Sequence, residues 1–284
     1  GIRNLVNIVA EQRSSAGVLV VVSAMNGTTD ELIELADVES LSDKDLLIKK
    51  LVDKHFSLIK DLKFDSVTEF NLKNELSCLF SYISNEVHTT IACNNCKRRD
   101  RIVSYGEILS ATVIGRYLTM RGIKSISVDA SSIVKTDDNF GKALPLMDTT
   151  LNNIEKKLLP LVKKGVILVV TGFIGSTNDG EITTLERGGS DCTATFMAKG
   201  LGASEITLYK DVDGVYDKDP KQFADAVLLQ EIDHETADIM AKNGNKVLAK
   251  KVIEPLFGTE IVMYMKNTFH PDSPGTKISP RLKG

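Results

Sequence analysis

The chain has 284 residues, of which 42% are hydrophobic, enough to bury the core of one large domain or two small ones. A net charge of −3 and an isoelectric point near 5.9 argue against nucleic acid or an anionic membrane as a partner, and no apolar run approaches the roughly 20 residues of a membrane span. The four cysteines are too few for a disulfide scaffold, so we expect reduced thiols and a cytoplasmic protein.

The first elements expected are a helix over residues 2–12 and a strand over residues 18–22. The strand is an unbroken apolar run, which is typical of a strand buried on both faces of a parallel sheet. In the turn that follows, Gly27 lets the chain reverse, and Thr28 or Thr29 can cap a helix over residues 30–36. Taken alone, this segment is an ordinary strand-to-helix turn.

Residues 40–97 are polar with apolar residues at helical spacing, which predicts a helical hairpin or small bundle without recognisable chemistry. The basic cluster 97–99 is predicted to be a solvated helix end. Ser104 and Glu107 have the spacing of a capping box that opens a helix reaching about residue 121.

Cys93 and Cys96 form a CxxC pair, but a zinc site normally needs four ligands. His88 is the only histidine near the pair in the sequence, and no second CxxC is present. We therefore assign no metal ligands.

The middle of the chain alternates between strand and helix signals. We expect a strand over residues 125–129, a β-containing insertion over 134–148, an amphipathic helix over 152–164 and a buried strand over 165–170. This alternation predicts an α/β fold with a mainly parallel sheet and right-handed crossovers. Helices near 235–243 and 247–257 and a strand over 260–265 complete the expected elements.

Residues 183–191 (TTLERGGSD) precede a helix expected over residues 192–201. Ser190 or Asp191 can cap that helix, and the two preceding glycines bring backbone N–H groups to its start, which favours an anion. Arg187 adds a fork of donors suited to a carboxylate or phosphate. The alternative is a capped turn with a solvated arginine.

A second polar turn, residues 208–220 (LYKDVDGVYDKDP), follows another apolar strand. Ligands of open α/β sheets bind at the carboxyl ends of strands, so the two turns are expected at one site.

Five segments together resemble aspartokinase, a member of the amino-acid kinase superfamily. They are the two turns above and residues 22–30 (VSAMNGTTD), 104–107 (SYGE) and 244–248 (GNKVL). The resemblance extends from about residue 18 to 278. It implies a three-layer α-β-α sandwich in one catalytic domain, with a helical excursion at about 40–100, an aspartate-binding lobe at about 1–165, a nucleotide-binding lobe at about 166–275 and no regulatory domain.

The resemblance implies ATP-dependent phosphorylation of the β-carboxylate of L-aspartate to 4-phospho-L-aspartate, the first step toward lysine, threonine and methionine. L-Aspartate and MgATP are the implied partners, and a homodimer is compatible with the family. The family's Lys-Phe-Gly-Gly turn is not among residues 1–284, which implies poor turnover by this chain as written. The alternatives are a sister kinase acting on acetylglutamate, glutamate or UMP, and a ligand-binding pseudokinase.

The same resemblance assigns the site residues. The residues implied in substrate binding are Ser23, Thr29, Glu107, Arg187, Gly188, Gly189 and Ser190. Arg187 would bind the α-carboxylate and Glu107 the ammonium. The residues implied on the nucleotide side are Gly172, Lys210, Asp211, Tyr216, Lys221 and Lys246. Asp191, Arg187 and Lys246 are the implied catalytic residues, with Asp191 organising the catalytic cation and Lys246 meeting phosphate charge. Lys210 stands where the family commonly has threonine.

Overall fold

A computed structural model describes residues 1–13, 17–89, 95–245 and 247–281. Its central strand is β3 (Ile167–Thr171), which pairs in parallel with β1 (Leu19–Val22) on one side and β2 (Ser125–Val128) on the other. Val22 lies opposite Thr171. The carboxyl ends of the three strands therefore meet at one edge of the sheet.

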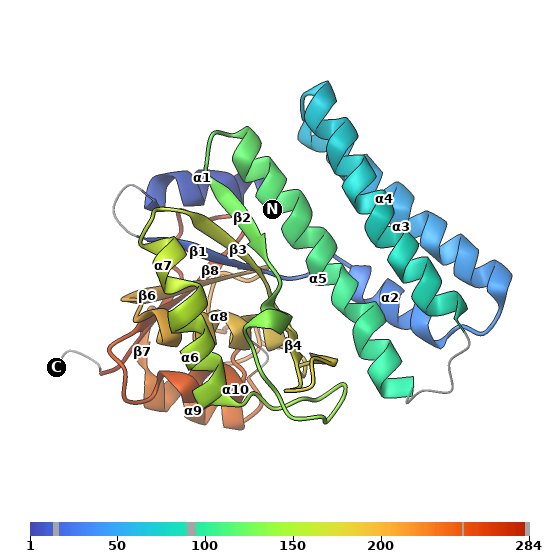
Figure 1. Ribbon diagram of the computed structural model, residues 1–284. Helices are drawn as coiled ribbons and strands as arrows, with labels where there is room; N and C mark the ends of the chain where they lie inside the picture. Colours follow the sequence, from blue (N-terminus) through green and yellow to red (C-terminus); the bar gives the residue numbers. More distant parts are fainter. Residues whose placement is uncertain (14–16, 90–94, 246, 282–284) are drawn as a thin grey trace.

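The two faces of β3 belong to two different hydrophobic cores. Ile167 and Val169 face one core, and Leu168 and Val170 face the other, as the period of two in a strand requires. The first core is covered by α1 (Ile2–Gln12), α2 (Thr28–Asp37) and α5 (Asn95–Met120). The second is covered by α6 (Met147–Lys157) and α8 (Gly189–Leu201). Helices on both faces of the strands (Figure 1) confirm the predicted sandwich.

A second sheet has the strand order β6-β8-β9-β7. Its strands are β6 (Glu205–Lys210), β7 (Glu231–Asp233), β8 (Val262–Asn267) and β9 (Thr276–Ser279). Only the β8–β9 pairing is antiparallel. The helical elements α9 (His234–Lys242), α10 (Lys250–Ile253) and η2 (Glu254–Leu256) contribute to the second core. A short antiparallel hairpin, β4 (Ile174–Ser176) and β5 (Ile182–Thr184), follows β3.

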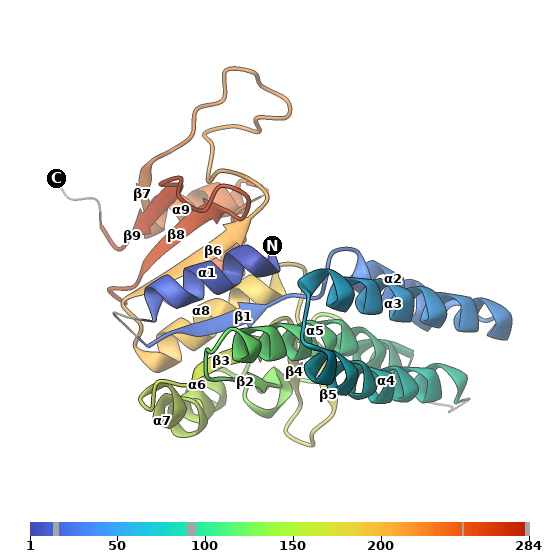
Figure 2. The ribbon, with the colours of Figure 1, turned by 90° about the horizontal axis from the view of Figure 1, so that it is seen from above.

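The helical excursion is a hairpin of α3 (Leu41–Leu62) and α4 (Ser66–His88), as predicted. Both helices are capped by side chains: Ser40 accepts from the Asp43 N–H, and Asp65 accepts from two backbone N–H groups of α4. The hairpin packs beside α2 and α5 and projects from the sandwich (Figures 1 and 2). Over the described ranges, none of the helices is long and apolar enough to cross a membrane.

The predicted capping box at Ser104 is wrong. Helix α5 already begins at Asn95, and its buried face includes Ile102 and Val103, so tertiary packing extends the helix through the local stop signal. The Ser104 hydroxyl donates to the Arg101 carbonyl, 2.7 Å away. Glu107 consequently lies inside the helix.

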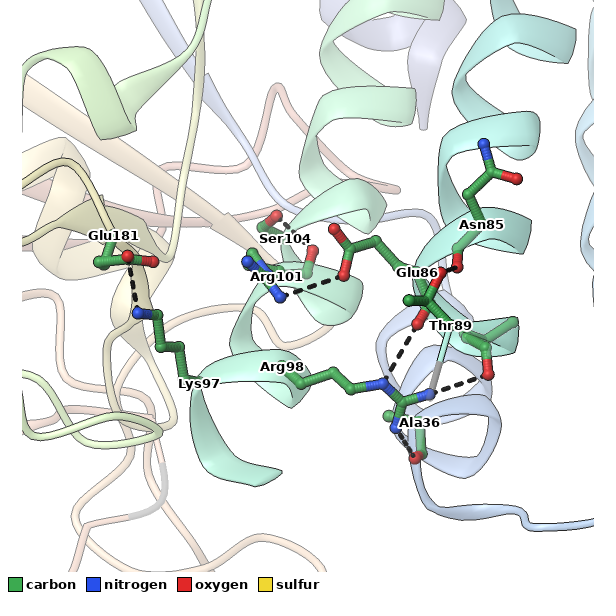
Figure 3. Close-up of polar contacts among 10 residues, drawn as sticks. Ala36, Asn85, Glu86, Thr89, Lys97, Arg98, Arg101, Ser104 and Glu181 are labelled. Atoms are coloured by element: carbon green, nitrogen blue, oxygen red, sulfur yellow. Dashed lines mark hydrogen bonds and ion pairs between the residues drawn. The ribbon is translucent and has the colours of Figure 1, made fainter. Parts of the chain in front are cut away.

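The basic cluster 97–99 lies at a helix end, as expected, since α5 begins at Asn95, but its side chains have protein partners and are not simply solvated. Arg98 donates to the carbonyl oxygens of Ala36 (3.3 Å), Glu86 (3.2 Å) and Val87 (3.0 Å). Figure 3 shows Arg98 with its labelled partners Ala36 and Glu86. These oxygens lie at the carboxyl ends of α2 and α4, where backbone acceptors lack intrahelical partners. One guanidinium thus joins α5 to the ends of two other helices.

Two further expectations are corrected. The single helix over 152–164 is interrupted at Leu158, and the short α7 (Leu159–Val162) follows, because Pro160 has no N–H and fits only the first turn of a new helix. Segment 134–148 is β-containing, as expected, but only through isolated bridges at Lys135 and Thr136. The expected helix over 247–257 is reduced to α10 and η2.

Candidate active site

The carboxyl ends of β1 and β3 meet the start of α8 at Gly172. Its N–H donates to the Val22 carbonyl at 2.8 Å. A Cβ at this position would lie 2.6 Å from the Cβ of Ser190, too close for any side chain. Only glycine lets the strand end approach the helix start this closely.

Helix α8 begins without a side-chain cap. Gly188 is the N-cap residue, with a left-handed φ of 85°, so the predicted capping by Ser190 or Asp191 is wrong. A Cβ on Gly189 would lie 2.8 Å from atoms of both Leu185 and Phe173. The paired glycines therefore bring a helix N-terminus to the strand ends, where its N–H groups and dipole favour an anion.

Glu107 is a buried carboxylate with one free oxygen. Its side chain is 2% exposed, and its Oε1 accepts the Ala24 N–H at 3.3 Å. Within the described part of the chain, Oε2 has no hydrogen-bond partner. Burial raises the pKa of Glu107 to about 7. A buried carboxylate oxygen without a partner is costly, so the site suits a ligand that supplies a cationic donor.

The β1–α2 turn contributes Ser23, which is exposed, and Thr29, which is half-buried. The predicted cap by Thr28 or Thr29 is wrong, because Gly27 is the N-cap, with a left-handed φ of 74°, and α2 begins at Thr28. The turn lies against α5, since a Cβ on Gly106 would lie 2.9 Å from the Cβ of Ala24.

Asp191 and Lys210 form an ion pair that joins the first turn of α8 to the end of β6. Their side chains are 17% and 29% exposed, respectively. The structure thus brings together two predicted site residues that are 19 positions apart in the chain.

Asp211, Tyr216 and Lys221, three further predicted nucleotide residues, lie on the segment between β6 and β7, which extends away from the sheets in Figure 2. Tyr216 bridges to Leu228 within that segment, while Asp211 and Lys221 are exposed. In residues 205–233, no hydrogen bond or ion pair joins Tyr216 or Lys221 to Lys210. Lys246 lies outside the described residues.

Arg187 lies in the turn between β5 and α8, exposed and without an ion pair among the described residues. It lines a cavity of about 440 Å³ whose walls include Leu185, Phe196 and Pro255. No contact joins Arg187 to Glu107 in the described chain. A ligand that contacted both residues would need a cationic group for Glu107 and an anionic group for Arg187.

Two residues at the site carried no signal in the sequence. Phe173 has a left-handed φ of 65°, a strained conformation for a non-glycine residue. Its N–H donates to the Thr193 hydroxyl at 3.1 Å and its carbonyl accepts the Leu185 N–H at 2.8 Å. These two bonds hold the strained residue between β3 and α8.

Asp100 is the second such residue. It is 3% exposed and accepts three hydrogen bonds, from the Gly141 N–H and from the N–H and hydroxyl of Thr184. Burial raises the pKa of Asp100 despite these donors. Asp100 thus fixes β5, and the Arg187 turn that follows it, to α5.

The chain has helices on both faces of a parallel sheet, with an uncapped helix start and an unsatisfied carboxylate at the strand ends. These are features of α/β proteins that bind ionic small molecules. Residues 1–267 match the model of the amino acid kinase family, and the chain belongs to this family.

The chain is similar to aspartokinases. It is 30% identical over 260 residues to lysine-sensitive aspartokinase 3 of Escherichia coli, covering 92% of this chain and 57% of that protein. It is 33% identical over 259 residues to the aspartokinase of Chlamydia pneumoniae, covering 91% and 56%. The chain therefore spans a little over half the length of these relatives.

The crystal structure of E. coli aspartokinase III in complex with aspartate and ADP superposes with a TM-score of 0.91 at 28% identity. The match covers 100% of this chain and 62% of that one. The resemblance to aspartokinase and the predicted fold are both confirmed.

Proposed function

We propose that this chain catalyses ATP-dependent phosphorylation of the β-carboxylate of L-aspartate. The observation that carries the proposal is the free, buried Oε2 of Glu107 at the carboxyl edge of the sheet. An α-ammonium supplies the charge and the donors that this oxygen lacks. The relatives add support, because they are aspartokinases and one was crystallised with aspartate and ADP.

Recognition of the amino acid rests on its two charged ends. Glu107 holds the ammonium, and Arg187 binds the α-carboxylate with its planar fork of donors. Ser23 and Thr29, in the β1–α2 turn, are assigned to the same substrate. This arrangement leaves the β-carboxylate directed toward the nucleotide.

The reaction requires positioning and charge stabilisation more than covalent chemistry. A β-carboxylate oxygen forms the new bond to the γ-phosphorus, the bond from that phosphorus to the β–γ bridging oxygen breaks, and ADP leaves with the electron pair. Donors from Gly188, Gly189 and Ser190 stabilise the transferring group at the start of α8. The N–H of Gly172, the fourth residue implied by the resemblance, donates to the Val22 carbonyl, so Gly172 contributes by letting β3 approach α8 closely. The Asp191–Lys210 pair places a cation beside it.

The nucleotide half is the second part of the proposal. Lys210, Asp211, Tyr216, Lys221 and Lys246 are assigned to it, with residues of about 166–275 forming the nucleotide lobe and those of about 1–165 the aspartate lobe.

Mg²⁺ fits this donor set as a companion of ATP. No group of three or more histidine, cysteine, aspartate or glutamate side chains in the described ranges could hold a metal alone. Kinase Mg²⁺ is held mainly by phosphate oxygens and water with one or two carboxylates, and Asp191 is the carboxylate at hand. Bound there, the ion would neutralise phosphate charge.

The test is a comparison of acceptors. The purified chain, and the same chain in its full-length gene product, are supplied with MgATP and either aspartate, glutamate, acetylglutamate or UMP. ADP release is followed together with trapping of the acyl phosphate by hydroxylamine. Aspartate-dependent hydroxamate is expected. Turnover of another acceptor, or nucleotide binding without turnover in the full-length protein, would overturn the proposal in favour of a sister kinase or a pseudokinase.

A further inference from the structure

Lys54 reaches from the helical excursion to the β1–α2 turn. Its Nζ lies 2.7 Å from the Asn26 carbonyl oxygen and 2.8 Å from Oε2 of Glu31, in the first turn of α2. The lysine is 31% exposed and the glutamate 17%, so the pair is partly shielded from water. Lys54 therefore holds both the backbone of the turn and the helix that follows.

The turn that Lys54 holds also orients Glu107. Ala24 lies two residues before Asn26, and its N–H donates to Glu107 Oε1. This bond fixes the carboxylate so that Oε2 remains free. A movement of the turn would therefore change the geometry and the proton affinity of Glu107.

The turn also packs against α5 at Gly106, but few polar contacts fix its backbone. Gly27 is left-handed, and no side chain caps α2. Within the turn, the Thr28 N–H donates to the Met25 carbonyl at 2.8 Å. Lys54 gives the next carbonyl, that of Asn26, a charged donor, and such hydrogen bonds are stronger than neutral ones.

We propose that Lys54 is a positioning residue of the amino-acid half of the site, acting through Asn26 and Ala24 on the carboxylate of Glu107. The inference rests on the proposed function, since it assigns to the excursion a role in aspartate binding. The α3–α4 excursion, whose sequence contains no recognisable functional motif, would then support substrate binding.

The chain provides a matched control in Lys50. Lys50 lies one helical turn before Lys54 and pairs with the same glutamate, with Nζ 3.7 Å from Glu31 Oε1, but it is 63% exposed and makes no bond to the turn. Lys50→Met removes the same charge from the same helix. The other ionisable neighbour is His55, which is buried and whose pKa is lowered mainly by burial, so it stays neutral near pH 7.

The first experiment needs no substrate. The Glu107 carboxyl is titrated by ¹³C NMR in the wild type, Lys54→Met, Lys54→Arg and Lys50→Met. Because the Ala24 N–H lowers the pKa of Glu107, loss of Lys54 should move the Glu107 midpoint to higher pH. Lys54→Arg, which can still donate to both oxygens, and Lys50→Met should leave it in place. An unchanged midpoint in folded Lys54→Met, or an equal change in Lys50→Met, would overturn the proposal.

The second experiment is kinetic and uses the full-length protein. Lys54→Met should raise the KM for aspartate about two- to thirtyfold, the range expected when a residue acts on a site through its neighbours, with the KM for ATP unchanged. A purely structural role predicts instead that active protein is lost while both KM values stay constant. If Lys54→Met does not fold, Lys54→Gln keeps one donor and should give an intermediate KM. Should aspartate not be a substrate, the proposed function fails, and the titration still decides the role of Lys54.

Discussion

Replacement of Glu107 by glutamine separates a binding role from a structural one. The buried Oε2 has no partner in the described chain, so its charge is available to a substrate ammonium. Glu107→Gln keeps the shape and removes the charge. A hydrogen bond to a charged group contributes about 1.5–3 kcal/mol, so the KM for aspartate should rise roughly ten- to a hundredfold while the KM for ATP stays nearly constant.

The pKa of Glu107 sets the pH dependence of this effect. With a pKa of about 7 in the free protein, roughly one carboxyl in ten is ionised at pH 6, and the apparent affinity for aspartate falls to about one tenth of its full value. The kcat/KM for aspartate should therefore rise about tenfold per pH unit below the pKa and level off above pH ~8. Glu107→Gln should flatten this limb of the profile.

Stability should change in the opposite direction from activity. Because the folded pKa is about 7 and the ordinary value is 4.5, the folded chain binds this proton more tightly than the unfolded chain. The tighter proton binding adds to the free energy of unfolding. This contribution is complete below pH 4.5 and is lost as the pH rises through 7, a change of up to about 3 kcal/mol. At pH 8, Glu107→Gln should therefore raise the melting temperature of the free protein.

The assay compares kinetics and thermal unfolding of wild type and Glu107→Gln between pH 5.5 and 8.5. A variant that is less stable at pH 8 and has wild-type kinetics would show that Glu107 only supports the helix, and would refute the binding role. A substitution on the same helix but away from the site, Arg116→Gln, removes only the exposed pair with Glu75 and serves as the control.

Three further outcomes are expected. Arg187→Lys should raise the KM for aspartate about ten- to a hundredfold, because lysine lacks the bidentate fork; equal weakening of ATP and aspartate in steady-state kinetics would place the arginine at the phosphates instead. Gly172→Ala puts a Cβ 2.6 Å from Ser190. We therefore expect the free energy of unfolding, measured with denaturant, to fall by about 1–3 kcal/mol and activity to be lost. Wild-type stability and activity would refute the close approach. MgATP at a hundred times its dissociation constant should stabilise the protein by about 2.7 kcal/mol in calorimetry, and no change at millimolar MgATP would contradict the nucleotide half.

The elements found from the sequence are those whose own residues carry the pattern. The helix at 2–12 is amphipathic, and the strand at 18–22 is wholly apolar. Both appear within a residue of the expected bounds. The paired helices of the excursion also follow from their spacing. Family motifs, rather than periodicity, located the candidate site residues.

Errors arose where distant residues decide local structure. The Ser104 box is a true local signal, but buried Ile102 and Val103 continue the helix through it. Glycines with positive φ replaced the expected side-chain caps at Gly27 and Gly188. The contacts of Lys54 with Asn26 likewise span 28 positions, and nothing in a single sequence encodes such a pairing.

The pairing of β1 with β3 has a consequence for synthesis of the protein. Strand β1 ends at Val22, and its partner begins at Ile167, so about 145 residues, including the whole excursion, leave the ribosome in between. At roughly 5–20 residues per second this takes about 7–30 seconds. During that interval the helical hairpin can already form from local contacts, whereas β1 has no neighbour and its apolar edge is exposed to other nascent chains. The apolar edge of β1 therefore stays unpaired until β3 has been made, and a chaperone that covers it in that interval would limit association with other chains.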